Sequence, residues 1–265
     1  MKRLILIKLG GSLITDKEKP FTPKTEVIDN LSKQIKEVLK QDKNLSLIIG
    51  NGGGSFPHYP AVKYKMNEGI KDDQQRYGFC LVQDAAARLN RIIVASLLKN
   101  RVNACSVSPS SMILSEGGKI KNFFIQPVVK MLDLNIIPVI YGDIVVDTVM
   151  GAKIFSTEHL LNQIVIRLKN SFKIIKVIHN GLTKGVLDSN GGLIKRINSN
   201  NFNRIKKIFY QTKGFDVTGG MAHKVKECID LAKYGIPSLI INGSLSKDIL
   251  KKAILGEKIE GTLID

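Results

Sequence analysis

The feature that most constrains the fold of this chain is a buried strand that ends in a glycine-rich loop. The apolar run Leu45–Ile49 leads directly into four glycines within residues 50–54. A side chain there would block a close approach of the backbone, and consecutive amide groups in such a turn form a nest that binds anions. His58 follows within reach of this nest. The stretch therefore predicts a phosphate-binding loop with one titratable ring beside it.

Strands and helices alternate along the rest of the chain. A strand predicted at Leu4–Leu9 ends at glycines 10 and 11, and the next helix is predicted to begin with Thr22 as N-cap and Pro23 at its first position. A strong helix is predicted over Gln83–Leu98, where apolar residues recur at helical spacing. Further strands are predicted at residues 104–107, 136–140, 174–178, 238–242 and 261–264, hairpins at 112–120 and 144–155, and helices at 127–134, 158–168, 202–210, 222–234 and 247–255.

This alternation predicts an α/β fold with three layers, αβα, around an open and mainly parallel sheet. The chain has 265 residues, of which 43% are hydrophobic, so it can bury a large core. We expect two closely joined lobes, residues 1–169 and residues 170–265, because no linker or low-complexity tract separates them.

Composition narrows the class of protein. The net charge of +17 suits a nucleic-acid partner, but the lysines are spread along helical segments, aromatic residues are only 6%, and no nucleic-acid motif is present. We therefore expect a lysine-rich solvated surface and no nucleic-acid partner. No apolar run approaches the length of a membrane span, so we expect a cytoplasmic protein with no membrane partner. The widely spaced Cys80, Cys105 and Cys228 are expected to be free thiols.

Three lysines lie near three glycine turns that follow predicted strands. The turns are at residues 10–12, 52–55 and 218–221, and the lysines are Lys8, Lys17 and Lys224. Lys8 interrupts an apolar strand, where an unpaired ammonium group would be costly. Because loops after parallel strands converge at one edge of a sheet, this pattern favours phosphoryl transfer, which needs positioned positive charge and little covalent chemistry. The P-loop, dinucleotide, zinc and serine-hydrolase patterns are all absent.

Several motifs together make the chain resemble the amino acid kinase superfamily and, within it, the isopentenyl phosphate kinases of archaeal type. They are Lys8-Leu9-Gly10-Gly11-Ser12, Ile14-Thr15-Asp16-Lys17, the loop from Gly52 to His58, Val107–Ser111, Pro138–Asp143, Asp216–Lys224 and Asn242-Gly243. The resemblance covers nearly the whole chain in the right order. It implies transfer of a phosphoryl group from ATP to isopentenyl phosphate, giving isopentenyl diphosphate for isoprenoid synthesis through the mevalonate pathway. It also implies Mg²⁺ as cofactor and a homodimer.

The resemblance further implies a role for each matching residue. The ATP phosphates would meet Lys8, Gly10, Gly11 and Ser12, and the nucleotide would also contact Gly54, Gly220 and Lys224. The transferring group would be stabilised by Lys17, and the acceptor phosphate would be bound by Gly53 and by His58, preferably as imidazolium because it need not act as a base. Glu158 could orient Lys8 and Lys224, and Thr157 is expected beside the substrate. His159, His179 and His223 are expected to be structural or exposed.

The chain departs from the family pattern in three places. Residues 156–159 read Ser-Thr-Glu-His where the family has Ser-Gly-Asp-Asp, and Pro57 replaces a usual glycine. Residues 181–185 lack both acids of the family's Thr-Asp-Val-Asp-Gly, a segment that borders the nucleotide. Two alternatives therefore stay open, a kinase that acts on another phosphate or phosphonate acceptor and a non-catalytic nucleotide-binding descendant.

Overall fold

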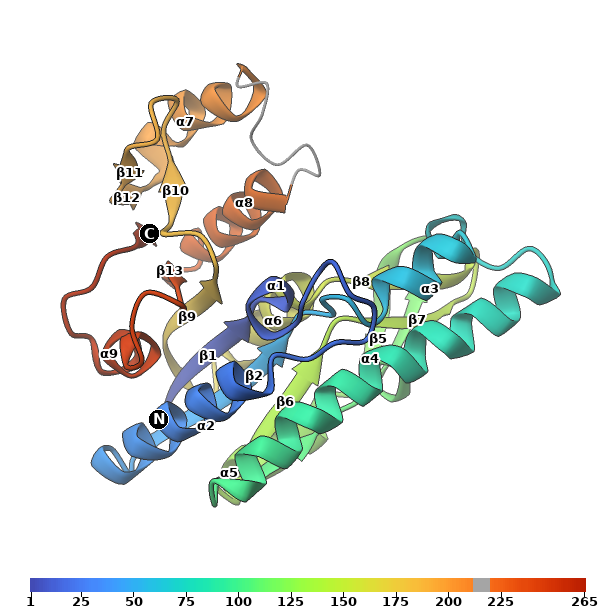
Figure 1. Cartoon of the computed structure of the whole chain (residues 1–265), viewed down its shortest axis with the longest axis horizontal. Coiled ribbons are helices and arrows are strands. Elements are labelled where there is room, and N and C mark those ends of the chain that lie inside the picture. Colours follow the sequence, from blue (N-terminus) through green and yellow to red (C-terminus); the bar gives the residue numbers. More distant parts are fainter. Residues whose placement is uncertain (212–219) are drawn as a thin grey trace.

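A single large sheet forms the centre of the molecule. The computed structural model describes residues 1–211 and 220–265. Within these residues, eight strands form a sheet in the order β12-β14-β13-β9-β1-β2-β6-β3 (Figure 1). All neighbouring strands in it are parallel except β13 and β14, which are antiparallel. The predicted mainly parallel sheet is therefore confirmed.

The elements of the large sheet and its helices have the following bounds. Its strands are β1 (Arg3–Leu9), β2 (Leu45–Asn51), β3 (Ala104–Ser106), β6 (Ile137–Tyr141), β9 (Lys173–Gly181), β12 (Arg196–Ile197), β13 (Ser238–Asn242) and β14 (Thr262–Ile264). The helices are α1 (Gly11–Ile14), α2 (Thr25–Gln41), α3 (His58–Lys63), α4 (Asp73–Lys99), α5 (Gln126–Asp133), α6 (Thr157–Leu168), α7 (Ser199–Gln211), α8 (Gly220–Ala232) and α9 (Ile249–Leu255).

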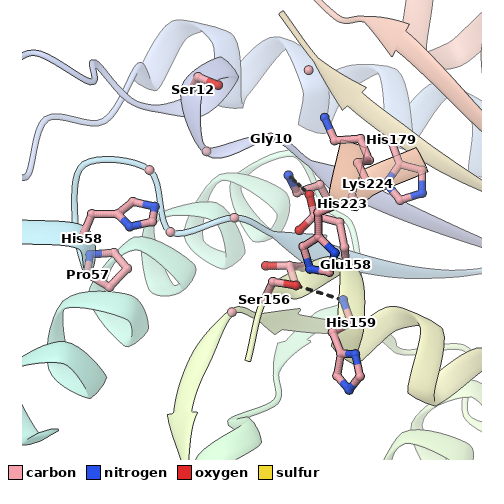
Figure 2. A pocket seen from close by; sticks show the side chains of 18 of the residues that line it. Gly10, Ser12, Pro57, His58, Ser156, Glu158, His159, His179, His223 and Lys224 are labelled. Atoms are coloured by element: carbon pink, nitrogen blue, oxygen red, sulfur yellow. Dashed lines mark hydrogen bonds and ion pairs between the residues drawn. The ribbon is translucent and has the colours of Figure 1, made fainter. Parts of the chain in front are cut away.

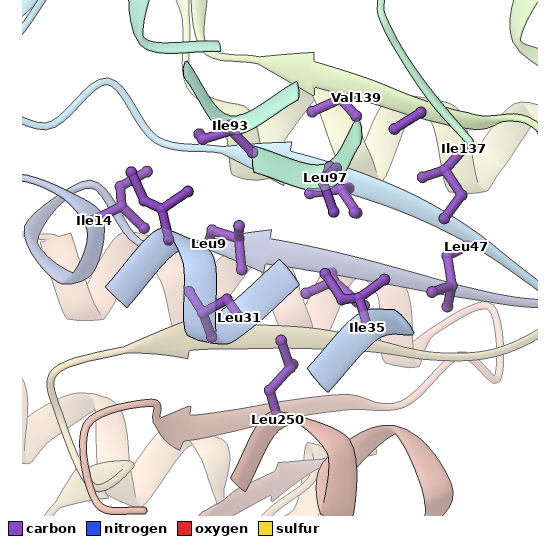
Figure 3. Packing of buried hydrophobic residues seen from close by; sticks show 14 of the residues in the cluster. Leu9, Ile14, Leu31, Ile35, Leu47, Ile93, Leu97, Ile137, Val139 and Leu250 are labelled. Carbon is purple, nitrogen blue, oxygen red and sulfur yellow. The ribbon is translucent and has the colours of Figure 1, made fainter. Parts of the chain in front are cut away.

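Helices cover both faces of this sheet because the strands are apolar on both sides. Along β1, Ile5, Ile7 and Leu9 pack against α2, α4 and α9, whereas Leu4 and Leu6 pack against α5 and α6. Figure 3 shows the first of these cores, in which side chains of α2, α4 and α9 meet the sheet. Strands buried on both faces are typical of parallel sheets enclosed by helices. The three-layer αβα architecture is thus confirmed, and the boundary between two lobes near residue 170 stays a prediction.

A second, four-stranded sheet packs beside the first. It has the order β5-β4-β7-β8 and consists of β4 (Ile113–Glu116), β5 (Lys119–Phe123), β7 (Asp143–Asp147) and β8 (Gly151–Phe155). Gly117 and Gly118 join β4 to β5 with φ of 56° and 79°, the left-handed conformation that a tight hairpin turn requires. The two predicted hairpins are confirmed. A further short hairpin joins β10 (Val186–Leu187) to β11 (Leu193–Ile194).

Two predicted helix starts are wrong. The helix α2 begins at Thr25 and not after Thr22, because Pro23 forms an extended bridge with Thr15. The helix α4 begins at Asp73, ten residues before the prediction, and the Asp72 side chain caps it by accepting a hydrogen bond from the Gln75 N–H. The first turns of α4 are mostly exposed, so they lack the apolar periodicity that marks the rest of the helix.

The glycine loops after β1 and β2 touch each other. A Cβ atom on Gly11 would lie 2.4 Å from the Gly54 nitrogen and 2.6 Å from its Cα, distances that real Cβ atoms do not reach. A Cβ atom on Gly53 would lie 2.3 Å from Cγ of Pro57. We expected the glycines of residues 50–54 to leave room for something bound. The structure shows that several of them are needed to let one part of the chain pack on another.

This contact predicts the effect of adding one methyl group. Gly11→Ala should lower the free energy of unfolding by about 1–3 kcal/mol, because the added carbon forces the two loops apart. The matched control is Gly181→Ala, whose Cβ meets nothing within 4 Å. Urea unfolding of both variants measures the difference. Equal stabilities for the two variants would show that the loops separate without cost.

Candidate active site

The loops at the carboxyl ends of β1, β2 and β9 enclose one large cavity. These three strands are neighbours in the sheet, so the segments that follow them converge. The cavity has a volume of about 840 Å³. Of the predicted site residues, eleven line it, namely Lys8, Gly10, Gly11, Ser12, Lys17, Gly53, Gly54, His58, Thr157, Glu158 and Lys224. The structure therefore brings together residues that are up to 216 positions apart.

Lys8 and Glu158 form an ion pair on the cavity wall. Lys8 Nζ lies 2.7 Å from Glu158 Oε1, and the two side chains are only 11% and 16% exposed. Burial alone would raise the pKa of Glu158, but the charge and hydrogen bond of Lys8, with a smaller contribution from Lys224, lower it to about 2. The lysine that interrupts an apolar strand thus has a carboxylate partner. Glu158 can hold it because α6 begins beside β1, with Ser156 capping the helix by accepting a hydrogen bond from the His159 N–H.

His58 lies across the cavity from Glu158 and Lys224 (Figure 2). It is the first residue of α3, so it belongs to a short helix and not to the loop that we expected. Partial burial and, secondarily, the charge of Lys17 lower the pKa of its ring, although the residue stays open to the cavity. The lowered pKa favours the neutral ring, and the imidazolium expected beside an acceptor phosphate stays a prediction. A bound phosphate would act in the opposite direction, because an anion stabilises the charged ring.

Sequence reasoning missed His179. Its ring lines the same cavity and is paired in register with Lys8 across β1 and β9. Its Nε2 lies 3.3 Å from Sγ of Cys228, and burial lowers the pKa of the imidazole to about 3, so the ring stays neutral. One signal could have found it, because His179 follows an apolar strand segment as Lys8 does in β1. His159 and His223 also line the cavity. We had expected all three histidines to be structural or exposed, with no place in the site.

Thr157 and Gly220 are the first residues of two helices that border the cavity, α6 and α8. The Thr157 hydroxyl donates a hydrogen bond of 2.7 Å to the Asn51 carbonyl, so it ties α6 to β2. Gly220 is the first residue of α8, the helix that carries Lys224 into the cavity. Residues 216–219 of the motif that precedes it lie outside the described residues.

The segment that lacks the family's two acids also borders the cavity. Gly181, Leu182, Thr183 and Gly185 line it, and Lys184 lies 3.9 Å from Glu260. This wall of the cavity offers backbone groups, one hydroxyl and an apolar side chain in place of two carboxylates. Any nucleotide bound here would meet less negative charge than the family pattern provides.

The described residues do not form a protein-held metal site. Across residues 1–211 and 220–265, no three His, Cys, Asp or Glu side chains are grouped so as to hold an ion. Among the described residues, four lysines line the cavity and supply positive charge there: Lys8, Lys17, Lys153 and Lys224.

The fold and this cavity define a phosphotransferase of the amino acid kinase type. The sequence model of the amino acid kinase family matches residues 3–242, and the chain belongs to that family. An isopentenyl phosphate kinase of Methanocaldococcus jannaschii is 36% identical, with 99% of this chain and 98% of the relative covered. One of Methanothermobacter thermautotrophicus is 32% identical, with 98% of each covered. A solved structure of isopentenyl phosphate kinase matches with a TM-score of 0.81 at 28% identity, covering 98% of this chain and all of that one.

The expected resemblance to isopentenyl phosphate kinases is therefore confirmed. In the part of the chain that the structure describes, no helix combines the length and the apolar character needed to cross a membrane.

The ion pair predicts how stability depends on pH. Because the pKa of Glu158 falls from 4.5 to about 2 on folding, its contribution is complete above pH 4.5 and is lost as the pH falls toward 2. Glu158→Gln should lower the free energy of unfolding at pH 7 by about 1–3 kcal/mol. The difference from wild type should shrink as the pH falls.

Urea unfolding between pH 3 and 7 measures this difference. The control is Glu37→Gln, which removes a more exposed carboxylate 2.8 Å from Lys251. It should change stability by less than about 1 kcal/mol. A deficit in Glu158→Gln that is independent of pH would contradict the assigned role of the Lys8 charge.

Proposed function

We propose that this chain transfers the γ-phosphoryl group of ATP to isopentenyl phosphate, giving isopentenyl diphosphate. The observation that carries the proposal is that one cavity holds Lys8, Lys17 and Lys224 together with the glycine loops at one end of the sheet, with His58 on the opposite wall. Phosphoryl transfer depends on positioning and on stabilisation of charge, which these groups can provide. The activity of the curated relatives supports the same reaction.

In this proposal the donor phosphates lie on the Lys8 side of the cavity. Lys8 and Lys224, with the backbone of Gly10, Gly11, Ser12 and Gly54, would neutralise the ATP phosphates. Glu158 would keep Lys8 oriented toward them, which its distance of 2.7 Å supports. Gly220 would contribute as the start of the helix that carries Lys224. Mg²⁺ would arrive on the nucleotide.

The acceptor phosphate would lie on the His58 side. Gly53 and His58 would bind it, and Lys17, whose charge reaches the His58 ring, would stabilise the group in transfer. Thr157 would border the substrate through its backbone, because its hydroxyl is already bonded to Asn51. An acceptor phosphate is already anionic, so no general base is required.

The apolar part of the acceptor would lie against the second sheet. Val82 and Ile154, together with Ala61, line the cavity there. Beside them, Phe79 packs against the apolar cluster formed by Met66, Val82, Ile144 and Ala152. A short branched alkyl chain matches this lining better than a charged group does.

Three further proposals accompany the reaction. The division at residue 170 would separate an acceptor lobe, residues 1–169, from a nucleotide lobe, residues 170–265. We also propose a homodimer, and a cytoplasmic location that is consistent with three free cysteines.

The proposal is tested by turnover of the purified chain with Mg-ATP and isopentenyl phosphate, followed by phosphorus NMR of the product. Wild type should form a diphosphate, and Lys17→Ala and His58→Ala should each lower kcat/KM by about 100-fold or more. The control is Lys19→Ala, which removes a neighbouring exposed lysine that does not line the cavity.

Each alternative has its own outcome in this assay. Turnover with another phosphate or phosphonate, and none with isopentenyl phosphate, would replace the proposed acceptor. Failure to bind ATP in calorimetry would indicate a non-catalytic descendant. Equal activity in wild type and His58→Ala would remove the phosphate-binding role from His58.

A further inference from the structure

A polar contact between α6 and α8 lies next to the reaction centre. The Asn162 Nδ2 group of α6 donates one hydrogen bond of 2.6 Å to Glu227 Oε2 and another of 2.9 Å to the Glu227 backbone carbonyl on α8. The Glu227 side chain is only 15% exposed. Because one bond reaches the backbone, the contact fixes the helix α8 itself and not only a side chain.

Two histidines approach the same carboxylate. His159 Nδ1 on α6 lies 3.5 Å from Glu227 Oε1, and His223 Nδ1 on α8 lies 4.0 Å from it. The His159 ring is held in place by stacking on Phe155, at 5.4 Å between centroids and 18° between planes. His159 stands where the family pattern has an acid, so this chain places a potential cation where an acid would repel Glu227.

The spacing of these residues connects the contact to the site. On α6, Asn162 follows Glu158 by four residues, and on α8, Glu227 follows Lys224 by three. Residues three or four apart lie on the same side of a helix, one turn and about 5.4 Å apart. The charge of Lys224 acts on Glu158. Along both helices, the charged residue near the ion pair therefore comes first, and the residue of the Asn162–Glu227 contact follows one turn later. Glu227 and Asn162 therefore meet about one helical turn away from Lys224 and Glu158.

We propose that Glu227 is a positioning residue for phosphoryl transfer, which, through its contacts with Asn162 and His159, sets Lys224 against the Lys8–Glu158 ion pair. Neither Glu227 nor Asn162 is among the described residues that line the cavity, so each would act on the reaction through the residues that it holds in place. A displacement of about 1 Å in a group that stabilises the transferring phosphate can lower the rate by as much as 100-fold. This inference deepens the proposed kinase activity and rests on it.

The test measures ATP binding and turnover separately in the full chain. Glu227→Ala should weaken ATP binding in calorimetry and lower kcat by about 10-fold or more, because Lys224 loses its support. The KM for isopentenyl phosphate should stay within about 2-fold of wild type, since the acceptor lies on the far wall. The control on the same helix is Asp230→Asn, which breaks an exposed ion pair with Lys233 and should leave all three values unchanged.

Two more variants keep the test decisive if Glu227→Ala does not fold. Asn162→Ala removes the same two hydrogen bonds from the α6 side and should give the same kinetic pattern. Glu227→Gln retains an oxygen that can accept from Asn162, so it should recover part of the lost kcat. Kinetics equal to those of Asp230→Asn, or a parallel loss of ATP and acceptor affinity, would overturn the proposal. Absence of turnover in wild type, with ATP binding weakened only in the Glu227 and Asn162 variants, would contradict the kinase activity and leave the positioning of Lys224 supported.

Discussion

The ion pair between Lys8 and Glu158 is the interaction on which the rest of the site depends. Lys8 lies on the central strand of the sheet, where an ammonium group without a partner would be costly. Glu158 compensates this charge from the first turn of α6, at 2.7 Å. The pair therefore fixes the beginning of α6 over the end of β1. The same helix carries Asn162 and His159, which contact Glu227 on α8. The buried charge of Lys8 therefore also affects where Lys224 lies.

Close packing of the backbone is the other constraint on the cavity. The loops after β1 and β2 meet at Gly11 and Gly54, and the first loop also meets the end of β9, because Gly10 N donates a hydrogen bond of 2.7 Å to the Asn180 carbonyl. These contacts bring three segments that line the cavity to one point. The glycines thus allow the loops that form the cavity wall to pack closely on one another, in addition to leaving room for a ligand.

Much of the fold could be predicted from the sequence, because apolar periodicity and glycine turns are local signals. The strand at Leu45, the hairpin at Gly117 and the open parallel sheet all follow from such signals. The start of α4 does not, since its first turns are exposed and carry no apolar pattern.

The part of the site that gives a local signal in the sequence could also be predicted. The charged residue in an apolar strand, Lys8, and the histidine beside a glycine loop, His58, stand out in the sequence. The position of His179 at the cavity and the contact of Asn162 with Glu227 do not, because each depends on how two distant elements pack. Likewise, the lowered pKa of His58 reflects burial and the charge of Lys17, which only the folded chain brings together.

We propose that Lys8 and Glu158 are kept as a charged pair for phosphoryl transfer and not for stability. The most direct test combines Lys8→Met with Glu158→Gln in one chain and measures both the free energy of unfolding and kcat. Stability should return to within about 1 kcal/mol of wild type, because neutral groups of similar size can replace a buried pair. Turnover should stay about 100-fold or more below wild type, since the charge that stabilises the phosphates is gone. Wild-type turnover in the double variant, or a loss of stability equal to the sum of the losses in the two single variants, would contradict this role of the ion pair.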